Sequence, residues 1–84
     1  MNIKTKFKIG DITYRIYSAQ ELSKVVEQTP ITTIIYDGEV EKVYYEFEYN
    51  SRRAESELYA TREEAQRDCD LVIKLAKLKK ENKQ

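Results

Sequence analysis

The chain has 84 residues and no formal net charge, because fifteen basic side chains balance fifteen acidic ones. This length allows one domain with a thin core, and the absence of histidine removes the commonest general base and metal ligand. No apolar run approaches the roughly 18 residues that span a bilayer, and the N-terminus lacks the apolar stretch of a signal peptide. We therefore expect a cytoplasmic protein with no membrane partner.

Residues 5–9 and 12–17 each alternate apolar with polar side chains, which is the period of a half-buried strand. Gly10 and Asp11 lie between them and supply a turn. The sequence therefore predicts two antiparallel strands at the start of the chain, with Tyr14 in the core.

Residues 18–28 allow two interpretations. Ser18 and Glu21 have the spacing of a capping box, which favours a short helix. Val25 and the neighbouring valine are β-branched, and the residue before Pro30 avoids helical geometry, so a strand followed by a turn also fits. We predict the strand and keep the short helix as the alternative.

Residues 31–36 are rich in Ile and Thr and end at Asp37 and Gly38, a pair typical of two-residue hairpin turns. Such a turn would place Tyr36 directly opposite Glu39. A hairpin is therefore predicted, with the second strand beginning immediately after the glycine.

The second strand of this hairpin is expected to reach about residue 49, with alternate side chains in the core and Tyr44 outside. The inward residues are Val43, Tyr45, Phe47 and Tyr49. Residues 50–53 would break the strand, and the apolar pair at residues 58–59 predicts a last short strand.

At Thr61 the pattern changes to the period of a helix. Thr61 and Glu64 form a capping box, acidic residues fill the first turn and lysines fill the last. We predict a helix from Arg62 to about Lys79, followed by a frayed polar tail over residues 80–84.

At 100° per residue, the apolar side chains of this helix fall on two arcs. The first arc has the small residues that suit close docking, and its members are Ala65, Cys69, Val72, Ile73 and Ala76. The second arc, called the leucine stripe below, consists of Leu71, Leu75 and Leu78. The leucine stripe either widens the buried face or remains exposed for another protein or a second copy of the chain.

Four features carry a family resemblance: the run from Phe7 to Asp11, the tyrosine-rich central strand, Asn50-Ser51-Arg52, and the run at residues 58–65. In this order they resemble small SH3-like barrel proteins encoded by bacterial phages and integrating elements. The resemblance implies a mainly β (α+β) fold, in which a small antiparallel barrel of about five strands is closed by the C-terminal amphipathic helix. It also implies one domain over residues 1–84, with the barrel at 1–60, the helix at 61–79 and the tail at 80–84. Residues 18–30 depart from the usual pattern.

The residues that enzymes need are mostly missing. Cys69 has no histidine to activate it, and two glycines cannot build a phosphate-binding loop. Asp37, Glu39 and Glu41 gather near a turn, but they lack the ligand positions of a calcium-binding loop. We therefore predict a protein that is not an enzyme and that uses no cofactor and no metal.

A cationic strand face interleaved with tyrosine gives one candidate surface, which would bind nucleic acid. This basic face consists of Lys4, Lys6, Lys8, Arg15 and Tyr17. In the competing interpretation, the lysines face Glu46 and Glu48 on a neighbouring strand and keep a sheet edge soluble. The neutral net charge favours the competing interpretation.

Tyrosine and arginine are the side chains that most often anchor protein interfaces. The candidate protein interface consists of Tyr44, Arg52, Arg53, Tyr59, Leu71, Leu75 and Leu78. We predict a non-catalytic protein-binding module, an accessory protein of a phage or mobile element that acts on a host or element-encoded protein. A weak homodimer through the helix is also expected, and a nucleic-acid-binding barrel is the alternative function.

Overall fold

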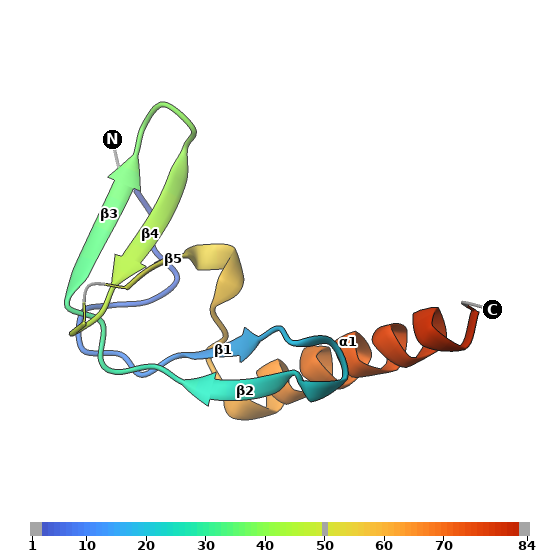
Figure 1. The fold of residues 1–84 in the computed structure, drawn as a ribbon. Coiled ribbons are helices and arrows are strands. Elements are labelled where there is room, and N and C mark those ends of the chain that lie inside the picture. The colour runs from blue at the N-terminus through green and yellow to red at the C-terminus, as the bar shows by residue number, and fades with distance from the viewer. Residues whose placement is uncertain (1–2, 50, 83–84) are drawn as a thin grey trace.

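The chain folds as a mixed α+β protein in a computed structural model that describes residues 3–49 and 51–82. Within these residues, two small antiparallel sheets are followed by one helix, α1, over Arg62–Asn82 (Figure 1). The first sheet contains β1 (Tyr14–Tyr17) and β2 (Lys24–Glu27), and the second contains β3 (Thr33–Asp37), β4 (Lys42–Glu46) and β5 (Arg52–Ala54). The predicted α+β class, antiparallel strands and C-terminal helix are confirmed.

The segment with two interpretations forms both elements in succession. A single 3-10 turn, η1 (Gln20–Leu22), is followed directly by β2, so the predicted strand is confirmed. Ser18 does not cap this turn. Instead the Ser23 hydroxyl accepts from the Ala19 N–H at 3.0 Å and donates to the Gln20 carbonyl at 2.7 Å.

The predicted two-residue turn at the tip of the second hairpin is wrong. Asp37 pairs with Lys42, so four residues connect β3 to β4. A two-residue type I′ turn needs positive φ at both central residues, but Gly38 does not have it and Glu41 does, at 53°. The Asp37 carboxylate accepts from the Glu39 N–H at 3.0 Å and stabilises this longer turn.

The strand predicted at residues 5–9 is also wrong, because this segment consists of bends and a turn. The Asp11 carboxylate accepts from the Lys8 N–H at 2.9 Å, and Gly10 adopts a φ of 93°, so the chain turns locally rather than pairing. The lysines of this segment therefore do not face Glu46 across a sheet. Glu46 instead pairs with Arg52 at 3.3 Å.

The third strand of the second sheet, β5, lies where a break was expected, and Asn50 of the predicted break is outside the described residues. Tyr59, predicted to belong to a last strand, contributes one isolated bridge to β1. Its N–H donates to the Tyr14 carbonyl at 2.8 Å, and its carbonyl accepts from the Tyr14 N–H at 3.0 Å.

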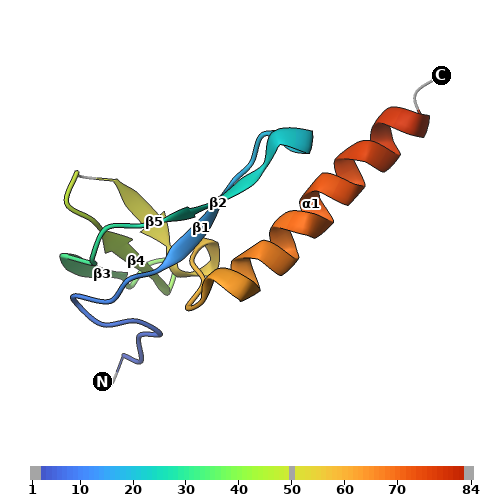
Figure 2. The same cartoon turned by 90° about the horizontal axis from the view of Figure 1, so that it is seen from below.

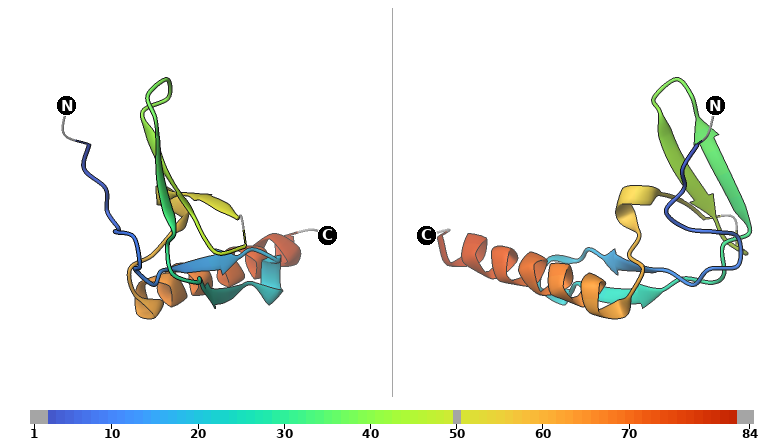
Figure 3. Two further views of the ribbon diagram at one scale, coloured as in Figure 1. Left: turned by 90° about the vertical axis from the view of Figure 1, so that its left-hand side faces the viewer. Right: turned by 180° about the vertical axis from the view of Figure 1, so that it is seen from behind.

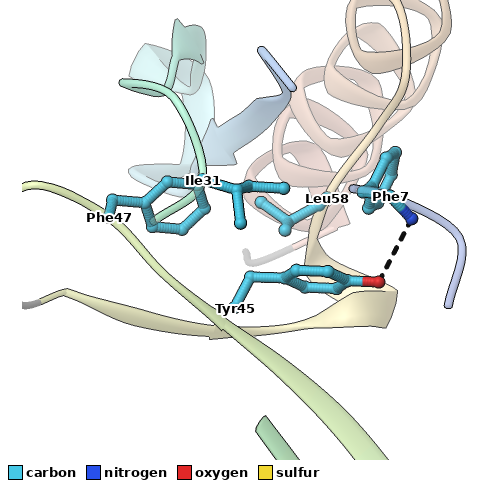
Figure 4. Close-up of a cluster of buried hydrophobic side chains, with 5 residues drawn as sticks. All are labelled: Phe7, Ile31, Tyr45, Phe47 and Leu58. Atoms are coloured by element: carbon cyan, nitrogen blue, oxygen red, sulfur yellow. Dashed lines mark hydrogen bonds between the residues drawn. The ribbon is translucent and has the colours of Figure 1, made fainter. Parts of the chain in front are cut away.

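The main core lies where the second sheet meets the N-terminal segment, the connection between β2 and β3 and the chain after η2 (Figure 4). Its members are Phe7, Ile31, Tyr45, Phe47 and Leu58. Tyr45 is fully buried, as predicted, whereas Tyr49 is 80% exposed because β4 ends at Glu46, so its predicted place in the core is wrong. Tyr14, predicted to be a core residue, is half-buried beneath α1.

The hydroxyl group of Tyr45 joins three segments of the chain. It donates to the Glu55 carboxylate in a second 3-10 turn, η2 (Glu55–Glu57), and accepts from the Phe7 N–H at 3.2 Å. The same carboxylate accepts from the Lys6 N–H at 2.9 Å. The rings of Phe7 and Tyr45 also meet edge to face, with centroids 5.5 Å apart.

The helix α1 runs along the β1–β2 hairpin, and its C-terminal end points away from the second sheet (Figures 1 and 2). The Thr61 hydroxyl accepts from the Glu64 N–H at 3.2 Å, which confirms the predicted N-cap. Ala65 and Cys69 are fully buried against the hairpin, and burial raises the pKa of the Cys69 thiol. Residues 80–82, predicted as tail, belong to the helix, and residues 83–84 lie outside the described part of the chain.

Two ion pairs fasten α1 to the hairpin, one near each end of the helix. Arg62 lies 3.4 Å from Glu27, and Lys80 lies 3.7 Å from Glu21. The resulting molecule is elongated, measuring 52 × 26 × 21 Å (Figure 3). In the described residues, no helix combines the length and apolar character needed to cross a membrane.

The Tyr45 hydroxyl predicts a measurable loss of stability. Replacing Tyr45→Phe should lower the free energy of unfolding by about 1–2 kcal/mol, because the Phe7 N–H and the Glu55 carboxylate each lose a partner. Urea denaturation at pH 7 measures this change. Tyr44→Phe is the matched control, since the Tyr44 hydroxyl makes no hydrogen bond among the described residues. Equal losses in the two variants would contradict the role of the network.

The same hydroxyl predicts a loss of stability in alkaline solution. Burial and the hydrogen bond to Glu55 raise the pKa of Tyr45 to about 12, above the value of about 10 for an unfolded chain. A raised folded pKa favours the protonated form, so this stabilisation is complete below pH 10 and is lost as the pH rises toward 12. The drop in urea midpoint above pH 10 should be smaller in Tyr45→Phe than in Tyr44→Phe.

Candidate functional site

A pocket of about 380 Å³ lies between the first sheet and the turn that follows β5. Six residues line it: Arg15, Ile16, Ser18, Arg53, Glu57 and Tyr59. A second pocket, of about 490 Å³, lies between the N-terminal segment and the β3–β4 hairpin, where Lys4 and Glu55 contribute to its lining. The first pocket has the more distinctive chemistry, because two arginine side chains meet there.

The alternation of side chains along β1 directs Arg15 into this pocket. Tyr14 faces α1, since the Arg62 guanidinium lies 5.1 Å from the centre of its ring, and the next residue therefore points to the opposite face. Arg53 arrives from β5, where it pairs with Tyr45. The two guanidinium groups are thus brought together by residues 38 positions apart in the chain.

The two arginines lack some of their hydrogen-bond partners within the described part of the chain. The Nε atoms of Arg15 and Arg53 are both buried and have no hydrogen-bond partner there. Burial, and then the positive charge of Arg53, lower the pKa of Arg15, and the Glu57 carboxylate offsets part of this effect. Arg53 itself lies 3.8 Å from Glu57. Two positive charges and one negative charge therefore share the pocket.

Tyr59 joins the pocket to the helix. Its backbone bridges to Tyr14, and its hydroxyl donates to the Asp68 carboxylate on α1 at 2.7 Å. This hydrogen bond, together with burial, raises the pKa of Tyr59 to about 12. The phenol is therefore protonated at neutral pH and holds the pocket wall against α1.

The pocket also contains the outer edge of β1. In an antiparallel ladder, alternate residues direct their N–H and C=O groups toward the partner strand. The Gln28 N–H donates to the Thr13 carbonyl at 2.8 Å, which places Arg15 and Tyr17 among the residues bonded to β2. Tyr14 and Ile16 therefore direct their backbone groups to the other side. Tyr14 meets Tyr59 there, whereas Ile16 has no backbone partner on that side in the described residues.

The residues predicted as a nucleic-acid face do not form one strand face. Lys4, Lys6 and Lys8 are exposed on the irregular N-terminal segment, and Lys4 lines the other pocket. Arg15 lies beside Arg53 instead. Tyr17 is exposed at the end of β1, with the Lys24 ammonium 5.8 Å from the centre of its ring.

The residues predicted as a protein interface fall on three surfaces. Tyr44 and Arg52 lie on the side of the second sheet that faces away from Tyr45. Arg53 and Tyr59 line the arginine pocket, and the leucine stripe lies on α1. Sequence reasoning missed Glu57, although its spacing of four from Arg53 is that of a local ion pair. No local pattern indicates that Arg15 approaches Arg53.

The search for related proteins returned no protein-family model, no curated protein and no solved structure that matches this chain. The resemblance to SH3-like phage barrels therefore stays a prediction. The function is accordingly inferred from the surfaces of this molecule alone.

The paired arginines predict an unusual effect of substitution. Arg15→Met should raise the free energy of unfolding by about 0.5 kcal/mol, because it removes a repulsion with Arg53 and the burial of a charge. Urea denaturation measures this gain, which should shrink in high salt because salt screens the repulsion in the unaltered protein. Lys8→Met, at an exposed lysine, is the matched control. A loss of stability in Arg15→Met beyond that of the control would show that Arg15 is held by favourable contacts.

Proposed function

We propose that this chain is a non-catalytic protein-binding module that docks on a partner protein through the leucine stripe of α1. It acts in the cytoplasm as an accessory protein of a phage or mobile element, on a host or element-encoded protein. The exposure of the leucine stripe is the observation that supports this proposal. Leu71, Leu75 and Leu78 are 53%, 62% and 46% exposed along one side of the helix.

The position of the stripe supports a role in binding rather than in folding. The helix already buries its small residues, Ala65 and Cys69, against the hairpin, and one exposed ion pair lies near each of its ends. The leucines are therefore not needed to pack the helix against the hairpin. Leu22 in η1, at the tip of the hairpin, is also exposed. A row of exposed apolar side chains, as in the leucine stripe, is typical of an interaction surface.

The path of the backbone supports the proposal that the fold is an SH3-like barrel. The chain passes from β2 in the first sheet to β3 in the second, and returns after β5 through η2. It then meets β1 again at the Tyr14–Tyr59 bridge. This circuit of antiparallel neighbours is the kind of strand order from which a small barrel is built.

Nucleic-acid binding is the second candidate, and one observation favours it. Lys4, Lys6 and Lys8 are exposed and belong to none of the ion pairs between described residues. Arg15 is separated from them in the arginine pocket, which reduces the length of any continuous basic track. A steep fall of DNA or RNA affinity with salt, abolished by reversing these three charges, would support this candidate.

The leucine stripe predicts weak self-association. Light scattering should show a concentration-dependent increase in mass that is lost in Leu75→Glu and Leu78→Glu, because a carboxylate opposes burial of the stripe. The free energy of unfolding should change by less than about 0.5 kcal/mol, as is typical of surface positions. A monomer at high concentration, combined with a destabilised Leu75→Glu variant, would mean that the stripe belongs to the core.

A comparison of variants tests the proposed partner. A protein captured from a bacterial lysate by the unaltered chain should be lost with Leu75→Glu, because the stripe is part of the contact. It should be retained with Lys77→Glu, a charge change on the solvent side of the same helix. Retention by Leu75→Glu would contradict the proposed docking surface.

A further inference from the structure

We infer that the open edge of β1 binds an extended segment of the partner protein in which acidic and apolar side chains alternate. The segment would pair with the backbone of Ile16, place a carboxylate between Arg15 and Arg53, and place apolar side chains against the leucine stripe. This inference rests on the proposed protein-binding function and specifies the chemistry of the partner.

The backbone edge of β1 beside the pocket already has one antiparallel neighbour. Tyr59 already pairs with β1 on this side, with hydrogen bonds of 2.8 and 3.0 Å to Tyr14, so the edge accepts an antiparallel neighbour. In this antiparallel register Glu57 would lie opposite Ile16, and the pairing stops after one bridge because Glu55–Glu57 form η2 instead of continuing along β1. The next outward-facing residue of β1 is Ile16, which lines the pocket. An added strand would satisfy its N–H and C=O groups.

The charge of the pocket favours an acidic ligand. The side of β1 that carries Arg15 faces Arg53, and their Nε groups have no partner in the described residues. Glu57 is the single carboxylate lining the pocket, so the lining carries a net charge of +1. Guanidinium groups bind carboxylates through paired N–H donors. One acidic side chain would therefore neutralise the pocket and occupy both arginines.

Leucine side chains of α1 border the opposite side of the same edge. Asp68 faces this edge, because it accepts the Tyr59 hydrogen bond. Leu75 follows Asp68 by seven residues and so lies about 20° from it around the helix, while Leu71 lies about 60° from it. These leucines therefore continue the flank of α1 that borders β1. Side chains of an added strand alternate between two faces, one toward the arginines and one toward the leucines.

The backbone edge, the charge of the pocket and the neighbouring leucines together favour a polypeptide over a nucleic acid. A phosphate backbone would satisfy the arginines, but it has no N–H groups to pair with the carbonyl of Ile16. It would also gain nothing from Leu75, and it would meet the Glu57 carboxylate in the pocket. Nucleic acid is therefore a contrary outcome of the test.

The test uses a capped synthetic peptide in which Glu alternates with Val, and a matched peptide with Lys in place of Glu. Each is titrated into the ¹⁵N-labelled full chain and followed by NMR and amide hydrogen exchange. We expect the Glu peptide alone to bind, with shifts at Arg15, Ile16 and Ser18 and slowed exchange of the Ile16 amide. N-methylation of the peptide backbone should abolish binding, because it removes the N–H donors.

Variants separate the contributions of charge and apolar contact. Arg15→Met and Leu75→Glu should each weaken binding of the Glu peptide about tenfold or more. Arg52→Met, which alters an exposed arginine on the other side of β5, should leave the affinity unchanged. Should a substitution disturb folding, the comparison of the Glu and Lys peptides on the unaltered chain still decides the question.

Several results would overturn the inference. These are no binding of the Glu peptide at millimolar concentration, equal binding of the Lys peptide, or shifts confined to residues 4–8. Displacement of the Glu peptide from the Ile16 edge by a single-stranded oligonucleotide, in a salt-sensitive manner, would assign the pocket to nucleic acid. A captured partner that is lost with Leu75→Glu but kept with Arg15→Met would overturn this inference while leaving the proposed function intact.

Discussion

The structure depends most on the buried hydroxyl of Tyr45, which joins the N-terminal segment, β4 and η2 at one point. Phe7 donates to it and Glu55 accepts from it, while the tyrosine ring lies in the main core. A hydroxyl without partners would be costly at this depth, so the hydrogen bonds with Phe7 and Glu55 allow Tyr45 to be buried where the three segments meet. The position of Glu55 in turn fixes η2, and η2 directs Leu58 into the core and Tyr59 toward β1.

Tyr59 carries this constraint to the other half of the molecule. Its backbone meets Tyr14 and its hydroxyl meets Asp68, so one residue connects the first sheet to α1. The arginine pocket is built on the same residues, with Glu57 supplied by η2 and Arg53 by the preceding strand. The pocket is therefore a consequence of how the two sheets are joined, and its shape follows from the core rather than from flexible loops.

The sequence predicts those elements that depend on neighbouring residues, such as helix caps and the alternation of side chains along a strand. The Thr61 cap and the small-residue arc identified α1, and alternation placed Tyr45 in the core. Alternation alone predicts that both Tyr45 and Tyr49 are buried. It could not show that Tyr49 is exposed, because the end of β4 depends on pairing with β5. The Asp37-Gly38 turn was wrong because the Asp37 side chain bonds the Glu39 N–H and favours a longer loop. The arginine pocket was not predictable, since Arg15 and Arg53 meet only through tertiary structure.

The two proposed contact features share an explanation. In a domain this small, a partly buried guanidinium weakens a narrow margin of stability, and an exposed leucine adds nothing to that margin. The leucine stripe takes no part in docking α1, which uses Ala65 and Cys69, and the arginine pocket contains one carboxylate, Glu57, for two guanidinium groups. The leucine stripe and the arginine pocket flank the same open edge of β1. One extended partner segment would therefore cover the apolar side chains, the charges and the backbone together, which two unrelated ligands would not do.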